Sequence, residues 1–326
     1  MLLNIALLII GLVLILAGAN FMTDGSVGIA KRFGMSDFLI GLTIVAMMTS
    51  APELVVSLTS AVNASPEMAI GNIVGSNIFN ICVIIGITAL IRPIAVTQGI
   101  LINEIPLVIL SSVVLLIMGC APILDGGPMS VTRVDGLLLL IFFIIFMRYT
   151  FASAKSAPQP ETAETPATAA HAPIPLWRAI LLTVGGLAAL IIGGQWFVDG
   201  ASGVARSIGW SEGLIGLTIL AAGTSLPELA TSIVSATKGF PGIALGNVIG
   251  SNIFNIFFVL GCTATVTPLS FGTISLFDLV VLVIASLLFW LFGWFYRQRT
   301  ITRLEGALLV IVYVAYIIRL YLNLPA

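Results

Sequence analysis

A forty-residue segment that occurs twice constrains the fold of this chain more than any other feature. Residues 41–80 and 216–255 both contain the block Thr-Ser-x-Pro-Glu-Leu, followed by Gly-Asn-x-x-Gly-Ser-Asn-Ile-Phe-Asn. Matched residues lie 175 positions apart throughout, as Glu53 and Glu228 do, with no insertion in either copy. One offset kept over forty positions indicates an internal duplication.

The composition places this duplication in a membrane. Of the 326 residues, 59% are hydrophobic and only 8% are charged, whereas a soluble domain has about 25% charged residues. Apolar runs of about 20 residues, the length that crosses a bilayer core of about 30 Å, recur along the chain. We therefore expect an all-α polytopic membrane protein with ten transmembrane helices, at about 3–22, 37–62, 67–91, 99–120, 133–151, 176–198, 212–237, 241–265, 273–296 and 304–323.

The ten predicted helices divide into two halves of five. The segment 153–175 is rich in Ala, Pro, Thr and Glu, a composition that cannot build a core, and it is predicted to be a flexible cytoplasmic linker. It separates an N-terminal five-helix repeat, 1–152, from a C-terminal one, 176–326. Because five is an odd number, equivalent motifs must face opposite sides of the membrane. The halves are therefore predicted to be inverted repeats.

The basic residues predict the orientation, because cytoplasmic loops of membrane proteins carry an excess of Lys and Arg. We assign ten of them to one side of the predicted helices: Lys31, Arg32, Arg92, Arg148, Lys155, Arg178, Lys238, Arg297, Arg299 and Arg303. The other side holds Arg133, Arg206 and Arg319. The larger group marks the cytoplasm, so both termini are expected on the non-cytoplasmic side of a bacterial inner (plasma) membrane.

The second and seventh spans are interrupted at their centres by proline. Pro52 cannot donate a backbone hydrogen bond and pushes the preceding residue away from helical geometry, and Thr49 and Ser50 can cap the helix that follows. The carbonyls that this frees need a partner, because bare backbone in lipid costs several kcal/mol. The same residue pattern surrounds Pro227. Each span is therefore predicted to be a broken helix that offers carbonyls and hydroxyls beside a carboxylate.

Glu53 and Glu228 follow these prolines directly. A proline kink with a glutamate that is hydrogen-bonded only for packing is the simpler explanation. However, an ionisable residue at the bilayer centre costs at least about 2.5–3.5 kcal/mol, and both halves have it among the same neighbours. We therefore expect the two glutamates to bind a cation at a central site that the two halves share.

The third and eighth spans carry a polar stripe next to the broken helices. Residues spaced by four share one face of a helix, and the stripe consists of Asn72, Ser76 and Asn80, repeated as Asn247, Ser251 and Asn255. We expect it to line the site, whereas Asn77 and Asn252, one position away, are expected to hold helices together. Glycines at the start of both spans have the spacing that lets helices approach closely: Gly71 with Gly75, and Gly246 with Gly250.

The duplicated blocks resemble the two alpha repeats of the sodium/calcium exchangers of the calcium/cation antiporter superfamily, particularly the short bacterial ones. The motifs are highly specific, and the resemblance covers nearly the whole chain. It implies ten helices around a central site for Ca²⁺ and Na⁺, with alpha repeats at 41–80 and 216–255. The metal ligands that it implies are Glu53, Glu228, Thr49, Ser50, Thr224, Ser225, Ser76, Ser251, Asn80 and Asn255, with the carbonyls of Ala46 and Ala221.

The sequence departs from the family's pattern at one pair of positions. Members often place an aspartate in one repeat where this chain has Asn80 and Asn255. A possible third carboxylate is therefore missing, which leaves the stoichiometry open.

The resemblance implies a secondary active antiporter that exchanges calcium for sodium by alternating access, and not an enzyme. A proton- or potassium-coupled antiporter of calcium or another divalent cation is an alternative, and a passive cation channel is a further one that the inverted repeat disfavours. Calcium ions, sodium ions and membrane lipid are the expected partners. Neither nucleic acid, nor a cofactor, nor a catalytic residue is expected, and a monomer is expected to suffice for transport.

Overall fold

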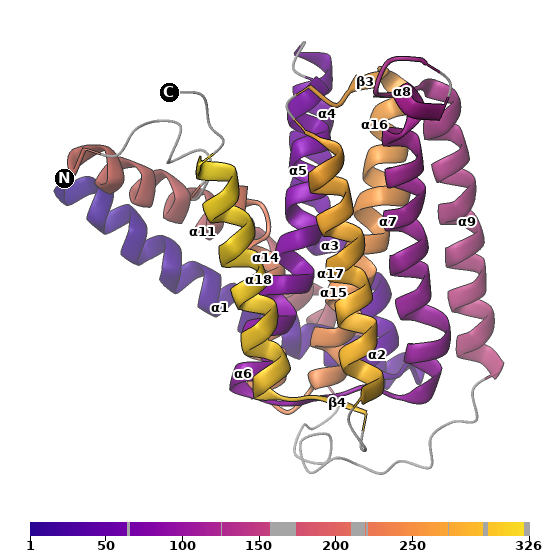
Figure 1. The fold of residues 1–326 in the computed structure, drawn as a ribbon. Coiled ribbons are helices and arrows are strands. Elements are labelled where there is room, and N and C mark those ends of the chain that lie inside the picture. The colour runs from indigo at the N-terminus through magenta and orange to yellow at the C-terminus, as the bar shows by residue number, and fades with distance from the viewer. Residues whose placement is uncertain are drawn as a thin grey trace. The chain divides into compact units, whose positions relative to one another are not determined.

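The structure is a computed structural model, and it describes residues 1–63, 66–124, 126–156, 174–209, 219, 221–272, 274–295 and 299–322 (Figure 1). Most of the predicted linker, 153–175, lies outside these residues, as does much of the first part of the predicted seventh span, 212–237. Within the described part, nine helices are long and apolar enough to cross a membrane. They correspond to the other nine predicted spans.

The elements follow the duplicated order, with η marking a π-helical segment. The first half contains α1 (Leu2–Phe33), α2 (Asp37–Ile40), η1 (Gly41–Val45), α3 (Ala46–Thr49), α4 (Ala51–Val62), α5 (Pro66–Phe79), η2 (Asn80–Ile85), α6 (Gly86–Ile91), η3 (Ile100–Glu104), α7 (Ile105–Gly119), α8 (Ala121–Leu124) and α9 (Arg133–Ser156). The second half contains α11 (Leu176–Ser207), α13 (Ala221–Gly223), α14 (Leu226–Thr237), α15 (Pro241–Ile253), η5 (Phe254–Leu260), α16 (Gly261–Val266), α17 (Leu276–Phe295) and α18 (Arg303–Leu322).

These elements form two compact units, which are described separately below. Unit 1 comprises Met1–Thr49, Ala157–Asn247 and Ile317–Ala326, and unit 2 comprises Ser50–Ser156 and Val248–Tyr316. Each unit combines segments of both predicted repeats. The division into five-helix repeats at 1–152 and 176–326 is a statement about duplication, whereas the units follow packing, so the repeat boundaries stay a prediction.

The helices α1 and α11 are longer than the sequence predicted. Each has 32 residues, because the last turns carry charged residues that end the apolar run before they end the helix. α1 stops only at Gly34, which has a φ of 63° and bonds its N–H to Ala30 O. Glycine adopts this left-handed cap without steric cost. The predicted ends at residues 22 and 198 therefore mark where the apolar part of each helix ends, not where the helix ends.

Unit 1 is built on α1 lying antiparallel against α11 (Figure 1). Glycines let the two backbones touch. A Cβ placed on Gly18 would lie 2.7 Å from Gly186 O, and one on Gly186 would lie 2.5 Å from Met22 N. Gly11 meets Phe197 N in the same way, at 2.5 Å. No side chain larger than a hydrogen fits at these crossings, which is the small-residue packing typical of membrane helices.

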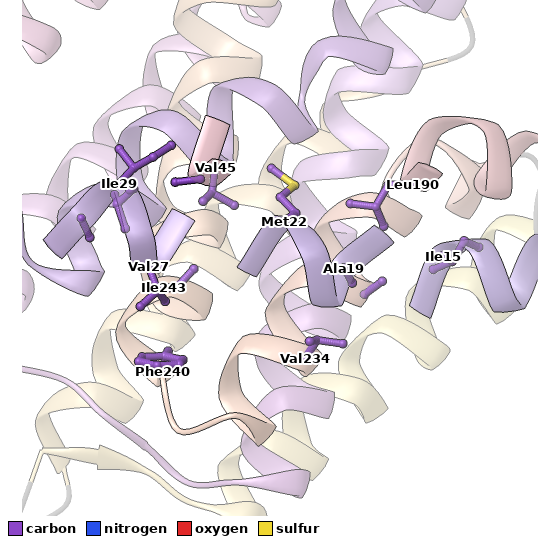
Figure 2. Packing of buried hydrophobic residues seen from close by; sticks show 14 residues of the cluster. Ile15, Ala19, Met22, Val27, Ile29, Val45, Leu190, Val234, Phe240 and Ile243 are labelled. Carbon is purple, nitrogen blue, oxygen red and sulfur yellow. The ribbon is translucent and has the colours of Figure 1, made fainter. Parts of the chain in front are cut away.

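A buried apolar cluster fixes α14 on this helix pair. Figure 2 shows Met22 of α1, Leu190 of α11 and Val234 of α14 among its members. Thr23 Oγ1 lies 3.1 Å from Ser235 Oγ, which adds a buried hydrogen bond between α1 and α14. Since α14 carries Glu228, the cluster determines where that carboxylate can lie in unit 1.

Unit 2 packs α4 against both α5 and η5, and α9 against η5 and α16. An edge-to-face pair of aromatic rings supports the contact of α9 with η5, with the Phe143 and Phe254 centroids 4.9 Å apart and their planes at 71°. Two short antiparallel ladders each join one half of the chain to the other. β1 (Ile94–Ala95) pairs with β4 (Thr300–Ile301), and β2 (Ser130–Val131) pairs with β3 (Leu269–Ser270).

The packing of α1 on α11 predicts that alanine substitutions at two adjacent glycines affect stability differently. We expect Gly186→Ala to destabilise the protein by about 1–3 kcal/mol, because its new methyl group meets the α1 backbone and over-packed interfaces cost that much. Gly185→Ala is the matched control, since no atom of the described residues lies within 4 Å of its Cβ position. Thermal unfolding in detergent measures both. Equal unfolding midpoints for the two variants would contradict this packing.

Candidate cation site

The first broken helix kinks over a single residue. α3 ends at Thr49 and α4 begins at Ala51, with Pro52 in its first turn. Ser50 between them has φ −81° and ψ 4°, in the sparsely populated bridge region. In the second copy α13 ends at Gly223 and α14 begins at Leu226, and Ser225 has φ −90° and ψ 6°. Both predicted breaks are therefore present, with the same local geometry.

The predicted capping of these second half-helices is wrong. Neither Ser50 nor Ser225 caps its helix through a side-chain hydrogen bond. Thr49 Oγ1 instead turns back and lies 3.1 Å from Val45 O. The reason is that Ser50 is close to helical geometry, so the neighbouring hydroxyls stay beside the preceding turn and do not reach the N–H groups ahead.

Two asparagines clamp the glutamate-bearing helices in matching ways. In unit 2, Asn72 Nδ2 lies 3.5 Å from Glu53 O and 3.2 Å from Ser57 Oγ. In unit 1, Asn247 Nδ2 lies 3.3 Å from Glu228 O and 3.1 Å from Ser232 Oγ. These four contacts obey the duplication residue by residue. The amide of the third or eighth span therefore fixes the backbone of the glutamate itself.

Asn247 also joins the two repeats within unit 1. Its Oδ1 lies 3.1 Å from Thr49 Oγ1, at the break in the first repeat, while its Nδ2 reaches Glu228 O, at the break in the second. One buried amide thus connects the hydroxyl of Thr49, a predicted ligand in the first half, to the backbone of Glu228, a predicted ligand in the second half.

In unit 2 the stripe residue Asn255 bonds to Asn77, which lies one position off the stripe of the first repeat. Asn255 Nδ2 donates to Asn77 Oδ1 at 3.0 Å, and Asn77 Nδ2 donates to Asn252 O at 3.2 Å. Asn77 therefore holds two helices together, as the sequence predicted for it. α4, which carries Glu53, packs on both α5 and η5, so elements from both repeats contact the helix that carries this carboxylate.

Most of the predicted ligands are excluded from solvent. Buried side chains belong to Ala46, Thr49, Ser50, Glu53, Ser76, Asn80, Ser225, Glu228, Ser251 and Asn255. Thr224 is half-buried, and Ala221 begins α13. Unit 1 holds Ala46, Thr49, Ala221, Thr224, Ser225 and Glu228, and unit 2 holds the remaining six.

Several of these buried polar atoms have no hydrogen-bond partner within the described ranges: Asn80 Nδ2 and Oδ1, Asn255 Oδ1, and Ser251 Oγ. Such an atom ordinarily costs about 1–3 kcal/mol. Asn80 opens the π-helical segment η2, and Asn255 lies in its counterpart η5; segments of this kind are frequent at functional sites. The free oxygens are neutral ligands of the type that Ca²⁺ and other hard cations take.

The predicted ligands are oxygen donors: carboxylates, hydroxyls, amides and carbonyls. No group of three or more His, Cys, Asp or Glu side chains gathers in the part of the chain that the structure describes. Hydroxyl, amide and carbonyl oxygens with carboxylates suit alkali and alkaline-earth cations.

The sequence did not predict that Asn72 and Asn247 clamp the glutamate-bearing helices. It assigned Asn72 and Asn247 to the lining of the site, yet both amides bind the neighbouring helix. The available signal was their spacing, since each lies 19 positions after its glutamate.

The glycine prediction holds in one repeat and fails in the other. A Cβ on Gly246 would overlap Phe38 O and lie 2.6 Å from Leu42 N, so this helix approaches its neighbour closely. A Cβ on Gly71 would meet only Ile274, at 3.5 Å, and one on Gly75 would meet no described atom within 4 Å. Among the described residues, Gly71 and Gly75 therefore do not bring α5 into close contact with another backbone.

Comparisons with known proteins agree with this arrangement. A sequence profile for the family described as sodium/calcium exchanger protein matches residues 3–152 and 178–322, once in each half. The chain is 36% identical over 330 residues to the inner membrane protein YrbG of Escherichia coli (strain K12), covering 98% of each protein. It is 31% identical over 350 residues to the sodium/calcium exchanger MaX1 of Methanosarcina acetivorans, again covering 98% of each.

A solved structure extends the likeness to the fold. The sodium-calcium exchanger NCX_Mj, soaked with 10 mM Na⁺ and 10 mM Sr²⁺, superposes with a TM-score of 0.82 at 33% identity, covering 100% of this chain and 99% of the other. The predicted fold class is thereby confirmed: an all-helical polytopic membrane protein made of two repeats, each with a broken helix.

The asparagine clamp predicts a large stability effect at one position. We expect Asn247→Ala to destabilise the protein by about 1–3 kcal/mol, because Thr49, Ser232 and the Glu228 carbonyl lose a buried partner. The matched control is Asn20→Ala, since the Asn20 side chain donates to the Leu16 carbonyl of its own helix, the bond from Lys238 to the Asn20 backbone oxygen is kept, and the change should alter stability by less than about 0.5 kcal/mol. Denaturant titration in detergent measures the free energy of unfolding of both variants. An unchanged free energy in Asn247→Ala would show that the clamp does not stabilise the protein.

Proposed function

The chain belongs to the sodium/calcium exchanger protein family and is a membrane cation antiporter, not an enzyme; on that premise we propose that it exchanges calcium for sodium by alternating access. The ions would bind at a central site to which both repeats contribute. The ligands would be Glu53 and Glu228, with the hydroxyl, amide and carbonyl oxygens of Thr49, Ser50, Thr224, Ser225, Ser76, Ser251, Asn80, Asn255, Ala46 and Ala221.

One observation carries this proposal furthest: Asn247 joins the break of the first repeat to the break of the second. It bonds both Thr49 and the backbone of Glu228. Thr49 and Glu228 are both fully buried. A buried hydroxyl that one amide links to the backbone of a buried glutamate, at two helix breaks, supports ligation of a cation better than separate packing roles.

The charge of the proposed site explains why exchange is coupled. Two ionised glutamates give the empty site a charge of −2, which one Ca²⁺ or two Na⁺ neutralise. An uncompensated dianion is costly to enclose in a medium of low dielectric constant. The empty site therefore resists occlusion while loaded sites cross, which makes transport an obligatory exchange.

The moving part would be the helix pair α1 and α11. Their backbones touch through Gly11, Gly18 and Gly186, so the two helices are expected to move as one body. On another face of α11, no described atom of another element lies within 4 Å of the Cβ positions of Gly185 and Gly194. Movement of a helix pair against the rest of the protein is a known way for inverted-repeat transporters to alternate access, and here the apolar contact of the pair with α14 would have to shift during that movement.

The protein is integral to the membrane, and we propose the inner membrane of a bacterium with both termini outside the cytoplasm. YrbG, which the chain matches along nearly its whole length, is an inner membrane protein. Within unit 1, α1 and α11 are antiparallel, so Lys31 and Arg178 lie at one end of the pair and Arg206 at the other. This separation agrees with the grouping of basic residues that predicts the orientation.

Calcium-45 uptake into proteoliposomes tests the proposed function. We expect an outward sodium gradient to drive uptake, and Glu53→Gln or Glu228→Gln to lower the rate by at least about a hundredfold, since each removes one of two charges that attract the cation in a poorly screened site. The double variant should be no slower than either single one, because one shared site is already lost.

The matched control is Glu67→Gln, an exposed glutamate in the first turn of α5, which should leave uptake unchanged. Proton or potassium gradients, imposed in place of sodium, identify a different coupling ion. Calcium loading through the wild-type protein with no counter-cation inside the vesicles would refute obligatory exchange.

An imposed membrane potential determines the stoichiometry. Three sodium ions per calcium move one net charge in each cycle, and 100 mV then contributes about 2.3 kcal/mol to the driving force. Two sodium ions per calcium move none. With only two carboxylates at the proposed site, we expect Asn255→Asp, which adds a third, to change the dependence of uptake on potential. An identical dependence in the variant would exclude Asn255 from the ligand set.

A further inference from the structure

A cavity of about 190 Å³ lies in unit 1 between the C-terminal half of α1 and the start of α11. Its lining combines apolar and charged side chains: Asp24, Val27, Gly28, Lys31, Ile174, Arg178 and Leu182. Gly28 leaves the room that Ile174 occupies, because a Cβ there would lie 2.8 Å from the Ile174 side chain.

The charge of this cavity is positive. Lys31 and Arg178 are exposed and line it from opposite helices. The one acidic lining residue, Asp24, is offset by Lys238, whose Nζ lies 2.7 Å from Asp24 Oδ1. Asp37 interacts electrostatically with Lys31 and reduces the excess, so the five charged groups together leave one net positive charge.

Backbone dipoles add to this positive potential. α11 begins at Leu176, so the cavity residue Arg178 lies in its first turn, where the N–H groups of Arg178 and Ala179 are bonded to Pro175 O and only the helix dipole acts on the cavity. A helix N-terminus carries about half a positive charge and is a site where anions are stabilised. The cavity therefore offers an anion two cationic side chains and a helix dipole together.

The surroundings place this cavity at the level of lipid headgroups. Trp177, beside Arg178, is 67% exposed, and Phe33, at the end of α1, is 64% exposed. Exposed aromatic side chains at the ends of spanning helices are typical of the membrane interface. Val27, Ile174 and Leu182 supply an apolar wall beside the charges, which a soluble anion does not need and an acyl chain can contact.

From this combination we propose that the cavity binds the phosphate group of an anionic phospholipid. Arg178 and Lys31 would pair with the phosphate, and the apolar wall would contact the glycerol and first acyl carbons. Basic pockets between membrane helices are known to recognise anionic headgroups. This site is separate from the proposed cation site and its existence does not depend on which ions the protein transports.

Native mass spectrometry of the full chain in detergent tests the proposal, with phosphatidylglycerol as the anionic probe and phosphatidylcholine as the zwitterionic one. We expect retained phosphatidylglycerol, with Lys31→Gln/Arg178→Gln weakening its binding by about thirtyfold, since two basic contacts to an anionic headgroup are lost. Arg148→Gln is the matched control, because Arg148 is exposed on α9, which lies in unit 2. This variant should bind phosphatidylglycerol as the wild type does.

A charge-conserving variant, Lys31→Arg/Arg178→Lys, separates charge from folding and should keep binding within about threefold. Equal retention in the glutamine variant, or an equal loss in Arg148→Gln, would overturn the proposal. So would displacement of phosphatidylglycerol by inorganic phosphate at millimolar concentration, which would make the cavity a site for a soluble anion.

Discussion

A carboxylate enclosed within a membrane-spanning helix must be compensated, and this requirement governs the arrangement around Glu53 and Glu228. Both side chains are fully buried, where an uncompensated charge costs at least about 2.5–3.5 kcal/mol. Proline one position earlier breaks each helix and supplies oxygens that an unbroken helix would use internally. The paired asparagines, Asn72 and Asn247, then hold the glutamate backbones so that these oxygens keep a fixed geometry.

The duplication is repeated in the local chemistry but not in all of the packing. Both clamps use the same three residue types, Asn, Glu and Ser, at the same spacing. By contrast, Gly246 lets two backbones touch, while its counterpart Gly71 meets only one side chain. The Lys238–Asp24 ion pair has no charged equivalent, because the first repeat carries Asn63 where the second carries Lys238. The two repeats therefore share the local chemistry around the glutamates but differ in their packing contacts.

Asn255 shows how an asparagine is accommodated at one of the two positions, Asn80 and Asn255, where a third carboxylate is absent. Its amide nitrogen donates to Asn77 Oδ1, a bond that an aspartate at this position could not make. The oxygen Oδ1 has no hydrogen-bond partner among the described residues and is left as a neutral ligand. The asparagine therefore fits the polar network of unit 2 without adding charge, and the glutamates remain the acidic members of the proposed ligand set.

The sequence alone determined the duplication, the membrane location, the two helix breaks and the acidic residues beside them. These follow from local rules: apolar length, proline geometry and the repetition of short motifs act on neighbouring residues and leave a readable pattern. For the same reason, nine predicted spans matched helices, with errors mainly at the ends of α1 and α11.

Only the tertiary structure decided which polar groups bond to which. It assigned Asn247 to Thr49 and Glu228, turned Thr49 back towards Val45, and left Gly75 beside open space. It also created the basic cavity of Lys31 and Arg178, residues nearly 150 positions apart in the chain. Such contacts depend on the crossing of helices from different repeats, and a linear spacing carries no information about where two helices cross.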